Sequence, residues 1–357
     1  MSASARRALR ALALLVPATA FPLASAAIAQ EPDAEPAKEG SASLDLGVAG
    51  VGLSFGGAPR WTGLRANWSD GYLERIDGVN LTLWKPGQDV GGSVNGLAIG
   101  VVAPSAAHLR GVSLGLGVLP GRSAWGVTVG ALGVVSGGPV NGLTVSGLGV
   151  VTEGGGRGVH VGGLGIVSEG PLQGVNLAGL GAVSQDRLDG LTLAGLGAVA
   201  EGGMLGVSVA GLGLVSQRDA TGVSVAGLGT VAEGDLRGVS LGGLGTVSSG
   251  RIQGIALGGL GVVSDRDIQG VAAGLGGVVT GAAVRGLAAG LYKVDASVVE
   301  GISVAGWNRT RSRHTGLAIG LFNQSEELHG VQIGLLNHAA NNRPPFRWVP
   351  LVNLHLN

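Results

Sequence analysis

The side chains that could carry chemistry in this chain are few and scattered. It has 357 residues, with 6 His, 23 Asp and Glu, and no Cys. His314, His329 and His338 are close in sequence but occupy different places in a local repeat, and no thiolate can join them as zinc ligands often do. The acidic residues lack the G-G-x-G-x-D spacing of calcium-binding repeats. We therefore predict no catalytic residues, no metal site and no cofactor.

Two further patterns resemble binding motifs. GLGxVxxG is typical of phosphate-binding loops, but a nucleotide site needs one such loop between a strand and a helix, and here it recurs many times. Small polar residues also recur at a fixed spacing and could form a flat face that binds ice or polysaccharide. We expect that face to be merely solvated; it comprises Ser113, Thr128, Thr144, His160, Asn176, Thr192, Ser208, Ser224 and Ser240.

Both patterns recur because most of the chain is one repeat. The sequence GVSVAGLGTVAEGDLR, residues 222–237, returns with changes every 16 residues. We number the first residue of each copy, the head Gly, as position 0. It stands at Gly126, Gly142, Gly158, Gly174, Gly190, Gly206, Gly222, Gly238, Gly254, Gly270 and Gly286, and at shorter spacings at Gly96, Gly111, Gly301, Gly316 and Gly330. Weaker copies begin at Gly63 and Gly78.

Each copy is predicted to consist of β-strands and turns. Several Gly in every copy exclude a helix, because each costs about 1 kcal/mol relative to Ala there. The V-x-V opening alternates with a period of two, as strands do, and the xEGxxxG segment is typical of turns. Positions 1, 3, 6 and 9 are mainly Val or Leu. We expect them to fill the inside, so that Leu228 is in the core and Ser224 is outside.

Two all-β architectures fit such copies. In a single-chain β-solenoid each copy is a coil, stacked about 4.8 Å from the next. In an outer-membrane β-barrel each copy is one strand of about ten residues and a turn. The segment from the head Gly to the next Gly-Leu is one residue shorter at 330 (GVQIGL) than at 222 (GVSVAGL). Such a deletion would flip part of a barrel strand but is absorbed at a solenoid corner. We favour the solenoid of 16-residue coils and keep the barrel as the alternative.

The residues at one position of successive copies form a column. Two such columns favour a solenoid with corners and with coils stacked in register. Position 7 is Gly in the central copies and Asn in the last three, and both residue types accept the left-handed conformation; the three are Asn308, Asn323 and Asn337. At position 11, acids mostly alternate with neutral residues, which separates like charges that would repel when stacked. That column reads Glu153, Glu169, Gln185, Glu201, Gln217, Glu233, Ser249 and Asp265.

The sequences near the two termini predict that the protein is exported and that the ends of the repeat array are capped. Arg6, Arg7 and Arg10 precede an apolar stretch and a small-x-small site, the pattern of a signal peptide, which we expect to be cleaved after Ala29. The predicted organisation is a signal peptide (1–29), a flexible polar leader (30–43), an N-terminal capping region of degenerate repeats (44–95), the repeat solenoid (96–340) and a C-terminal cap (341–357). Most Trp are expected to cover the ends of the core, namely Trp61, Trp68, Trp84, Trp307 and Trp348.

The C-terminal copies indicate a class of protein. GLAIGLFN (316–323) and GVQIGLLN (330–337) resemble a family of bacterial surface or secreted repeat proteins built from G-Φ-x-Φ-G-L-Φ-N units, and PPFRWVPLVNLHLN (344–357) resembles its closing tail. The central copies depart from it, with Gly in place of Asn. The resemblance implies an exported location and no known chemistry.

The net charge of the chain limits the classes of partner that we expect it to bind. Without the three Arg of the signal peptide, the 23 basic residues become 20 against 23 acidic ones, which gives no reason to expect nucleic-acid binding. We predict an exported, non-enzymatic protein with a structural or surface-interaction role. Its partner is unknown, with a cell-envelope component or a polysaccharide as candidates. The alternatives are a barrel with a transport or structural role, and a solenoid with one face that binds polysaccharide or ice.

Overall fold

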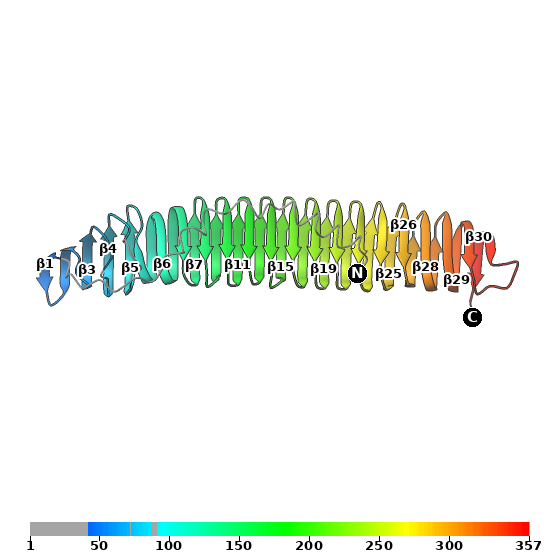
Figure 1. Ribbon diagram of the computed structural model, residues 1–357, viewed down its shortest axis with the longest axis horizontal. Coiled ribbons are helices and arrows are strands. Elements are labelled where there is room, and N and C mark those ends of the chain that lie inside the picture. The colour runs from blue at the N-terminus through cyan, green and yellow to red at the C-terminus, as the bar shows by residue number, and fades with distance from the viewer. Residues whose placement is uncertain (1–41, 72, 87–90, 357) are drawn as a thin grey trace, which may run out of the picture.

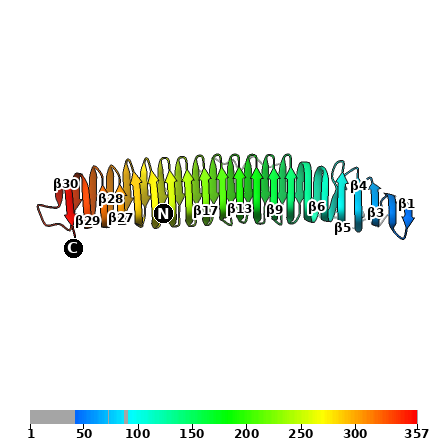
Figure 2. The same ribbon diagram turned by 180° about the vertical axis from the view of Figure 1, so that it is seen from behind.

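The protein is an all-β rod. The computed structural model describes residues 42–71, 73–86 and 91–356, so the predicted signal peptide and nearly all of the leader lie outside the described residues. The rod is a β-solenoid of about 17 turns, with coils about 16 residues apart. Figures 1 and 2 show it from two sides, with β1 at one end and β30 at the other. The solenoid prediction is confirmed, and the barrel alternative does not describe this fold.

Each central coil contains a seven- or eight-residue strand and a four-residue strand. The longer strands form what we call the long sheet: β7 (Val140–Ser146), β9 (Gly156–Gly162), β11 (Leu172–Ala178), β13 (Leu188–Ala194), β15 (Met204–Ala210), β17 (Ala220–Ala226), β19 (Leu236–Gly242), β21 (Ile252–Gly258), β23 (Ile268–Gly274), β25 (Ala283–Gly290) and β27 (Val298–Val304). The shorter strands form the short sheet: β8 (Gly149–Thr152), β10 (Gly165–Ser168), β12 (Gly181–Ser184), β14 (Gly197–Ala200), β16 (Gly213–Ser216), β18 (Gly229–Ala232), β20 (Gly245–Ser248), β22 (Gly261–Ser264), β24 (Gly277–Thr280) and β26 (Lys293–Ala296).

Toward the ends the strands are less regular. They are β1 (Ser43–Val48), β2 (Val51–Gly56), β3 (Arg60–Asn67), β4 (Arg75–Thr82), β5 (Ser93–Gly100), β6 (Ser105–Ser136), β28 (Trp307–Ile319), β29 (Phe322–Ala339) and β30 (Trp348–His355). Every strand from β2 to β29 pairs in parallel with the equivalent strand of the next coil, with Gly222 opposite Gly206 and Gly238. Among the described strands, only the two outermost pairs, β1–β2 and β29–β30, are antiparallel.

The side chains face the opposite way from the prediction. Positions 2, 4, 8, 10 and 14 point into the coil, and Ser224 at position 2 is only 6% exposed. Leu228 at position 6 is half-exposed, and many Val and Leu of positions 1, 3 and 9 are exposed. The interior is narrow, and it is filled chiefly by Ala, Ser and Thr, with Leu, Ile and Val at positions 8 and 14. These small residues let the two sheets approach closely, so the Val and Leu side chains of positions 1, 3, 6 and 9 are placed outside.

Buried hydroxyl groups close the turns of the coils. Ser184, Ser216 and Ser264 at position 10 are each at most 1% exposed. Ser264 Oγ donates to the carbonyl oxygen of Gly250 at 2.9 Å, and Ser216 Oγ donates to that of Asp219 at 3.1 Å. These position-10 hydroxyl groups are therefore satisfied by carbonyl oxygens of the turns, as most buried polar groups are.

The head Gly has a conformation that other residues avoid. Gly222 lies within β17 with a φ of 114°, in the region that favours glycine. A Cβ built on it would lie 2.1 Å from the carbonyl oxygen of Gly206 in the preceding coil. The prediction of left-handed residues at position 7 is wrong for most copies, although Gly277 has a φ of 148°. Gly213 there does not have a positive φ, and neither do the three Asn of the last copies.

Those three Asn stack inside the C-terminal coils instead. Asn308 Nδ2 donates to Asn323 Oδ1, and Asn323 Nδ2 donates to Asn337 Oδ1, both at 2.7 Å. All three side chains are at most 2% exposed. In register, Asn308 lies opposite Val294, which lies opposite Val278. The amide ladder therefore takes the place of the buried aliphatic residues of position 8 in joining the last coils.

The expected capping by Trp holds for one residue. Trp61 is 6% exposed, and its Nε1 donates to the carbonyl oxygen of Gly52 at 2.9 Å. Trp68, Trp84 and Trp348 are each more than half exposed, so they do not cover the core. The outermost strands at the two ends are β1 and β30, which pair antiparallel with β2 and β29.

The Gly residues at positions 0 and 7 should respond differently to substitution by Ala. Gly222→Ala should lower the free energy of unfolding by about 2 kcal/mol or more. Ala is strained at that φ, and its methyl group would clash with the backbone of the preceding coil. Gly213→Ala should change it by less than about 0.5 kcal/mol, because its Cβ would meet nothing nearer than 3.8 Å. Urea denaturation of both variants measures the difference. Equal losses would contradict the role given to the head Gly.

The facing of the columns can be tested in the same way. Ser224→Asp places an unpaired carboxylate in the narrow interior and should cost several kcal/mol. Leu228→Asp places it at a half-exposed turn and should be tolerated within about 1 kcal/mol. Greater damage from Leu228→Asp would show that the leucines belong to the core after all.

Candidate interaction surface

The residues considered for chemistry do not come together. His314 is buried in β28, the His338 ring lies 4.3 Å from the Trp348 ring, and the His329 ring lies 6.1 Å from the His355 ring. In the described part of the chain, no group of three or more His, Cys, Asp or Glu side chains could hold a metal ion. The polar column at position 2 is buried from Ser113 to Ser240, so it offers no face to ice or polysaccharide.

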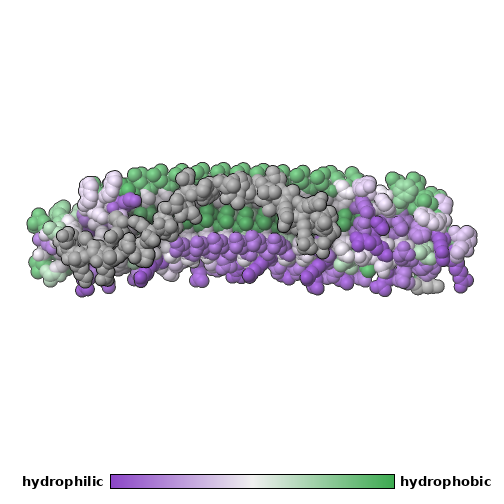
Figure 3. All heavy atoms as spheres, viewed as in Figure 1, coloured by the Kyte–Doolittle hydropathy of each residue, from purple (hydrophilic) through white to green (hydrophobic). Residues whose placement is uncertain are grey.

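The most extensive surface feature is instead apolar. It runs along the turn that joins each long-sheet strand to the next short-sheet strand, and we call it the apolar edge. It appears as the green band along the upper side of Figure 3. Its members are between 42% and 75% exposed: Trp68, Trp84, Val101, Leu116, Leu132, Leu148, Leu164, Leu180, Leu196, Leu212, Leu244, Leu260, Leu275, Leu291, Leu321 and Leu335.

The Gly-Leu-Gly sequence of the turn forces the leucines outward. At position 5 a Cβ on Gly211 would lie 2.1 Å from the carbonyl oxygen of Gly195, so no side chain fits at Gly211. The backbone N–H of Leu212 donates to the carbonyl oxygen of Leu196 at 2.7 Å. The turns therefore stack as tightly as the strands, and the only side chain they carry points away from the rod.

Apolar side chains continue from the edge onto both sheets. Val207 at position 1 and Leu193 at position 3 are 39% and 38% exposed on the long sheet, and Val183 at position 9 is 38% exposed on the short sheet. No charged residue occupies positions 4 to 8 in the copies from Gly126 to Gly270. The edge and its flanks thus form one uncharged surface far larger than single exposed leucines would make.

Charged residues gather on the opposite turn, which we call the polar edge. Arg237 contacts Asp219 Oδ2 at 2.9 Å and Asp235 Oδ2 at 2.7 Å. The backbone N–H of Asp235 donates to Asp219 Oδ1 at 2.9 Å, and that of Arg251 donates to Asp235 Oδ1 at 2.8 Å. The acidic side chains thus join one coil to the next. The rod is amphipathic across its width, with one apolar and one polar edge.

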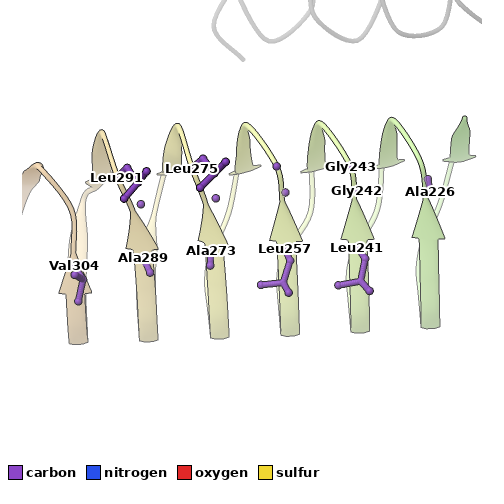
Figure 4. A pocket seen from close by; sticks show the side chains of 14 residues that line it. Ala226, Leu241, Gly242, Gly243, Leu257, Ala273, Leu275, Ala289, Leu291 and Val304 are labelled. Atoms are coloured by element: carbon purple, nitrogen blue, oxygen red, sulfur yellow. The ribbon is translucent and has the colours of Figure 1, made fainter.

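The apolar surface is hollowed at one place. A groove of about 710 Å³ crosses the long sheet beside the edge, and Figure 4 shows its lining. Position 3 is Ala273 and Ala289 in two successive coils, where the adjacent coils have Leu257 and Val304. In these same coils the edge leucine moves to position 5, so Leu275 and Leu291 stand over the two alanines. All lining residues are Gly, Ala, Val or Leu.

Sequence reasoning missed a buried polar network near the N-terminus. Arg65 is 0% exposed, and its Nη1 donates at 2.8 Å both to Asp70 Oδ1 and to Asn80 Oδ1. Burial lowers the pKa of Arg65, while the Asp70 carboxylate opposes that shift. Arg65 and Asn80 occupy position 2, which the prediction placed outside. Because position 2 faces inward, a charged residue at this position of the sequence indicates an ion pair inside the coil.

His160 occupies the same inward column without a partner. It is 0% exposed, and neither ring nitrogen has a hydrogen-bond partner. Desolvation by burial lowers its pKa to about 4, so the ring is neutral in the folded chain at neutral pH.

Comparison with known family models, with curated proteins and with solved structures gives no match. Within the described residues, no helix is long and apolar enough to span a membrane. The assignment of a function therefore depends on the geometry of the two edges.

Buried His160 predicts an acid-sensitive stability. Its folded pKa of about 4 lies below the ordinary value of 6.5, so the unfolded chain binds more protons between these pH values and stability falls as pH decreases. This His alone should remove about 2 kcal/mol between pH 6.5 and pH 5. His160→Thr, which copies Thr144 of the preceding coil, should abolish that part of the slope in denaturation curves. An unchanged slope would contradict a neutral buried ring.

Proposed function

We propose that the protein is an exported, non-enzymatic rod that lies lengthwise on the lipid surface of the cell envelope through its apolar edge. The observation that carries this proposal is the continuity of the edge, which extends from Trp68 to Leu335 with exposed apolar side chains. About 17 turns spaced by about 4.8 Å give a contact line of about 80 Å.

The distribution of charge favours lipid over a soluble protein partner. The apolar edge offers no ion pairs or side-chain hydrogen bonds that could orient a protein, whereas interfaces with soluble partners have a polar rim. Structures that lie in a membrane interface bury an apolar face and keep a charged face in water. The polar edge, with Arg237 and the Asp residues around it, provides the charged face.

Aromatic side chains at the N-terminal end fit the same interpretation. Trp68 and Trp84 are 67% and 52% exposed, and their rings stack with centroids 6.4 Å apart. Trp is enriched where membrane and water meet, because its ring is apolar and its N–H is polar. The two rings extend the leucine row at the depth where an interfacial contact would place them.

The groove adds a place where an alkyl chain could enter. Its walls include Leu275 and Leu291 of the apolar edge, so a lipid chain in contact with the edge reaches it without crossing polar surface. A polysaccharide has less support, because the hydroxyl column that could have bound it is buried.

Lipid binding should depend on the apolar edge and not on added charge in general. The purified chain should co-sediment with phosphatidylcholine vesicles and do so equally at high salt, because the contact is apolar. The triple variant L180D/L212D/L244D should weaken binding by more than about tenfold, since each buried Leu contributes about 1.5 kcal/mol or more.

A matched control adds the same three carboxylates to the polar edge. Q185D/Q217D/S249D should bind vesicles like the original chain. Equal losses in both variants, or no vesicle binding by the original chain, would overturn the proposal. If L180D/L212D/L244D instead dissociates an oligomer in the absence of lipid, the edge contacts a second copy.

A further inference from the structure

The two ends of the rod differ in how their outermost strands are protected. Exposed strand edges invite pairing with another chain, and proteins block them with Pro, Lys, bulges or strong irregularity. At the C-terminal end, β30 contains Pro350, which lacks an N–H. Leu351 has a φ of 67°, and the pairing with β29 shifts between Gly334 and Asn337. This end is a poor template for a further strand.

The N-terminal end has none of these features in its described residues. All six residues of β1 are exposed, and its register with β2 is regular from Ser43↔Gly56 to Val48↔Val51. Within the described part of the chain, β1 pairs only with β2. Leu44, Leu46 and Val48 are 64%, 57% and 82% exposed, so this edge combines unpaired backbone with an apolar face.

The hairpin fixes which backbone groups point outward. Ala49 and Gly50 have φ values of 53° and 80°, the pattern of a two-residue type I′ turn. Val48 and Val51 are then a hydrogen-bonded pair, and the bonding alternates along an antiparallel ladder. The N–H and C=O groups of Ser43, Asp45 and Gly47 consequently face away from β2.

We propose that two copies of the chain join end to end through antiparallel pairing of β1 with β1 of the second copy. A two-fold contact of this kind closes on itself. Because the C-terminal end is blocked, the product is a dimer of about twice the rod length and not a fibre. The long sheet continues across the junction.

Charge and the apolar pattern select one register. When Leu46 lies opposite its own equivalent, Leu44 lies opposite Val48, and Asp45 lies opposite Gly47. All three apolar side chains then meet on one face. A shift of one copy by two residues places Asp45 opposite Asp45, where like charges repel. The register centred on Leu46 is therefore preferred.

The absence of Cys from the chain permits a cross-linking test. At the proposed axis the two Leu46 Cα atoms are about 4.5 Å apart, within the range of about 4.4 to 6.8 Å that a disulfide requires. Leu46→Cys should convert to a covalent dimer under mild oxidation. Asp45→Cys should not, because the two residues 45 are diagonal to each other at about 7 to 8 Å.

Solution size provides a second measurement. Light scattering and small-angle X-ray scattering of the purified chain should give twice the monomer mass and about twice the rod length. Leu46→Lys, which brings two cations together at the axis, should return both values to those of a monomer. A monomer at all concentrations, filaments, faster cross-linking of Asp45→Cys, or a dimer that persists in Leu46→Lys would each overturn the proposal.

Discussion

The structure depends on the close approach of one backbone to the next at the head Gly. At Gly222 the carbonyl oxygen of Gly206 occupies the space that a Cβ would need, and the positive φ redirects the strand at that point. The same contact recurs from Gly63 to Gly330. It holds successive coils in register without side chains, so the other positions of the repeat are free to differ.

This backbone contact accounts for the inverted distribution of side chains. The coil encloses little volume, so Ala, Ser and Thr fill most of it and the large aliphatic side chains inside are confined to positions 8 and 14. The backbone ladders between coils pair the polar groups of the strand backbones. Stability then comes from many hydrogen bonds and tight packing of small groups, which act between neighbouring coils as in other repeat proteins. The Val and Leu that ordinarily drive folding remain on the surface, where they are available for contact with another body.

The sequence was sufficient for the architecture but not for the facing of the strands. Periodicity, Gly content and the one-residue deletion near Gly330 predicted stacked coils, because these properties reflect the backbone. Alternation with a period of two shows that a strand has two faces, but it does not say which one is inside. The assumption that Val and Leu are buried assigned Leu228 to the core and Ser224 to solvent. For the same reason the inward pairing of Arg65 with Asp70 was missed. Of the Trp expected to cap the ends, only Trp61 is buried, and Trp68 and Trp84 lie on the apolar edge.

The separation into columns explains how such a rod can gain a local site without losing its fold. The coils at Gly270 and Gly286 keep the head Gly and the inward residues of their neighbours, with Ile268 and Val284 both fully buried. The two coils share two outward changes, the Ala at position 3 and the shifted leucine at the turn. Those changes create the groove. The fold tolerates them because outward-facing residues contribute little to stability and each coil contacts only its neighbours. Binding properties can therefore vary along the rod, coil by coil, while the interior stays constant.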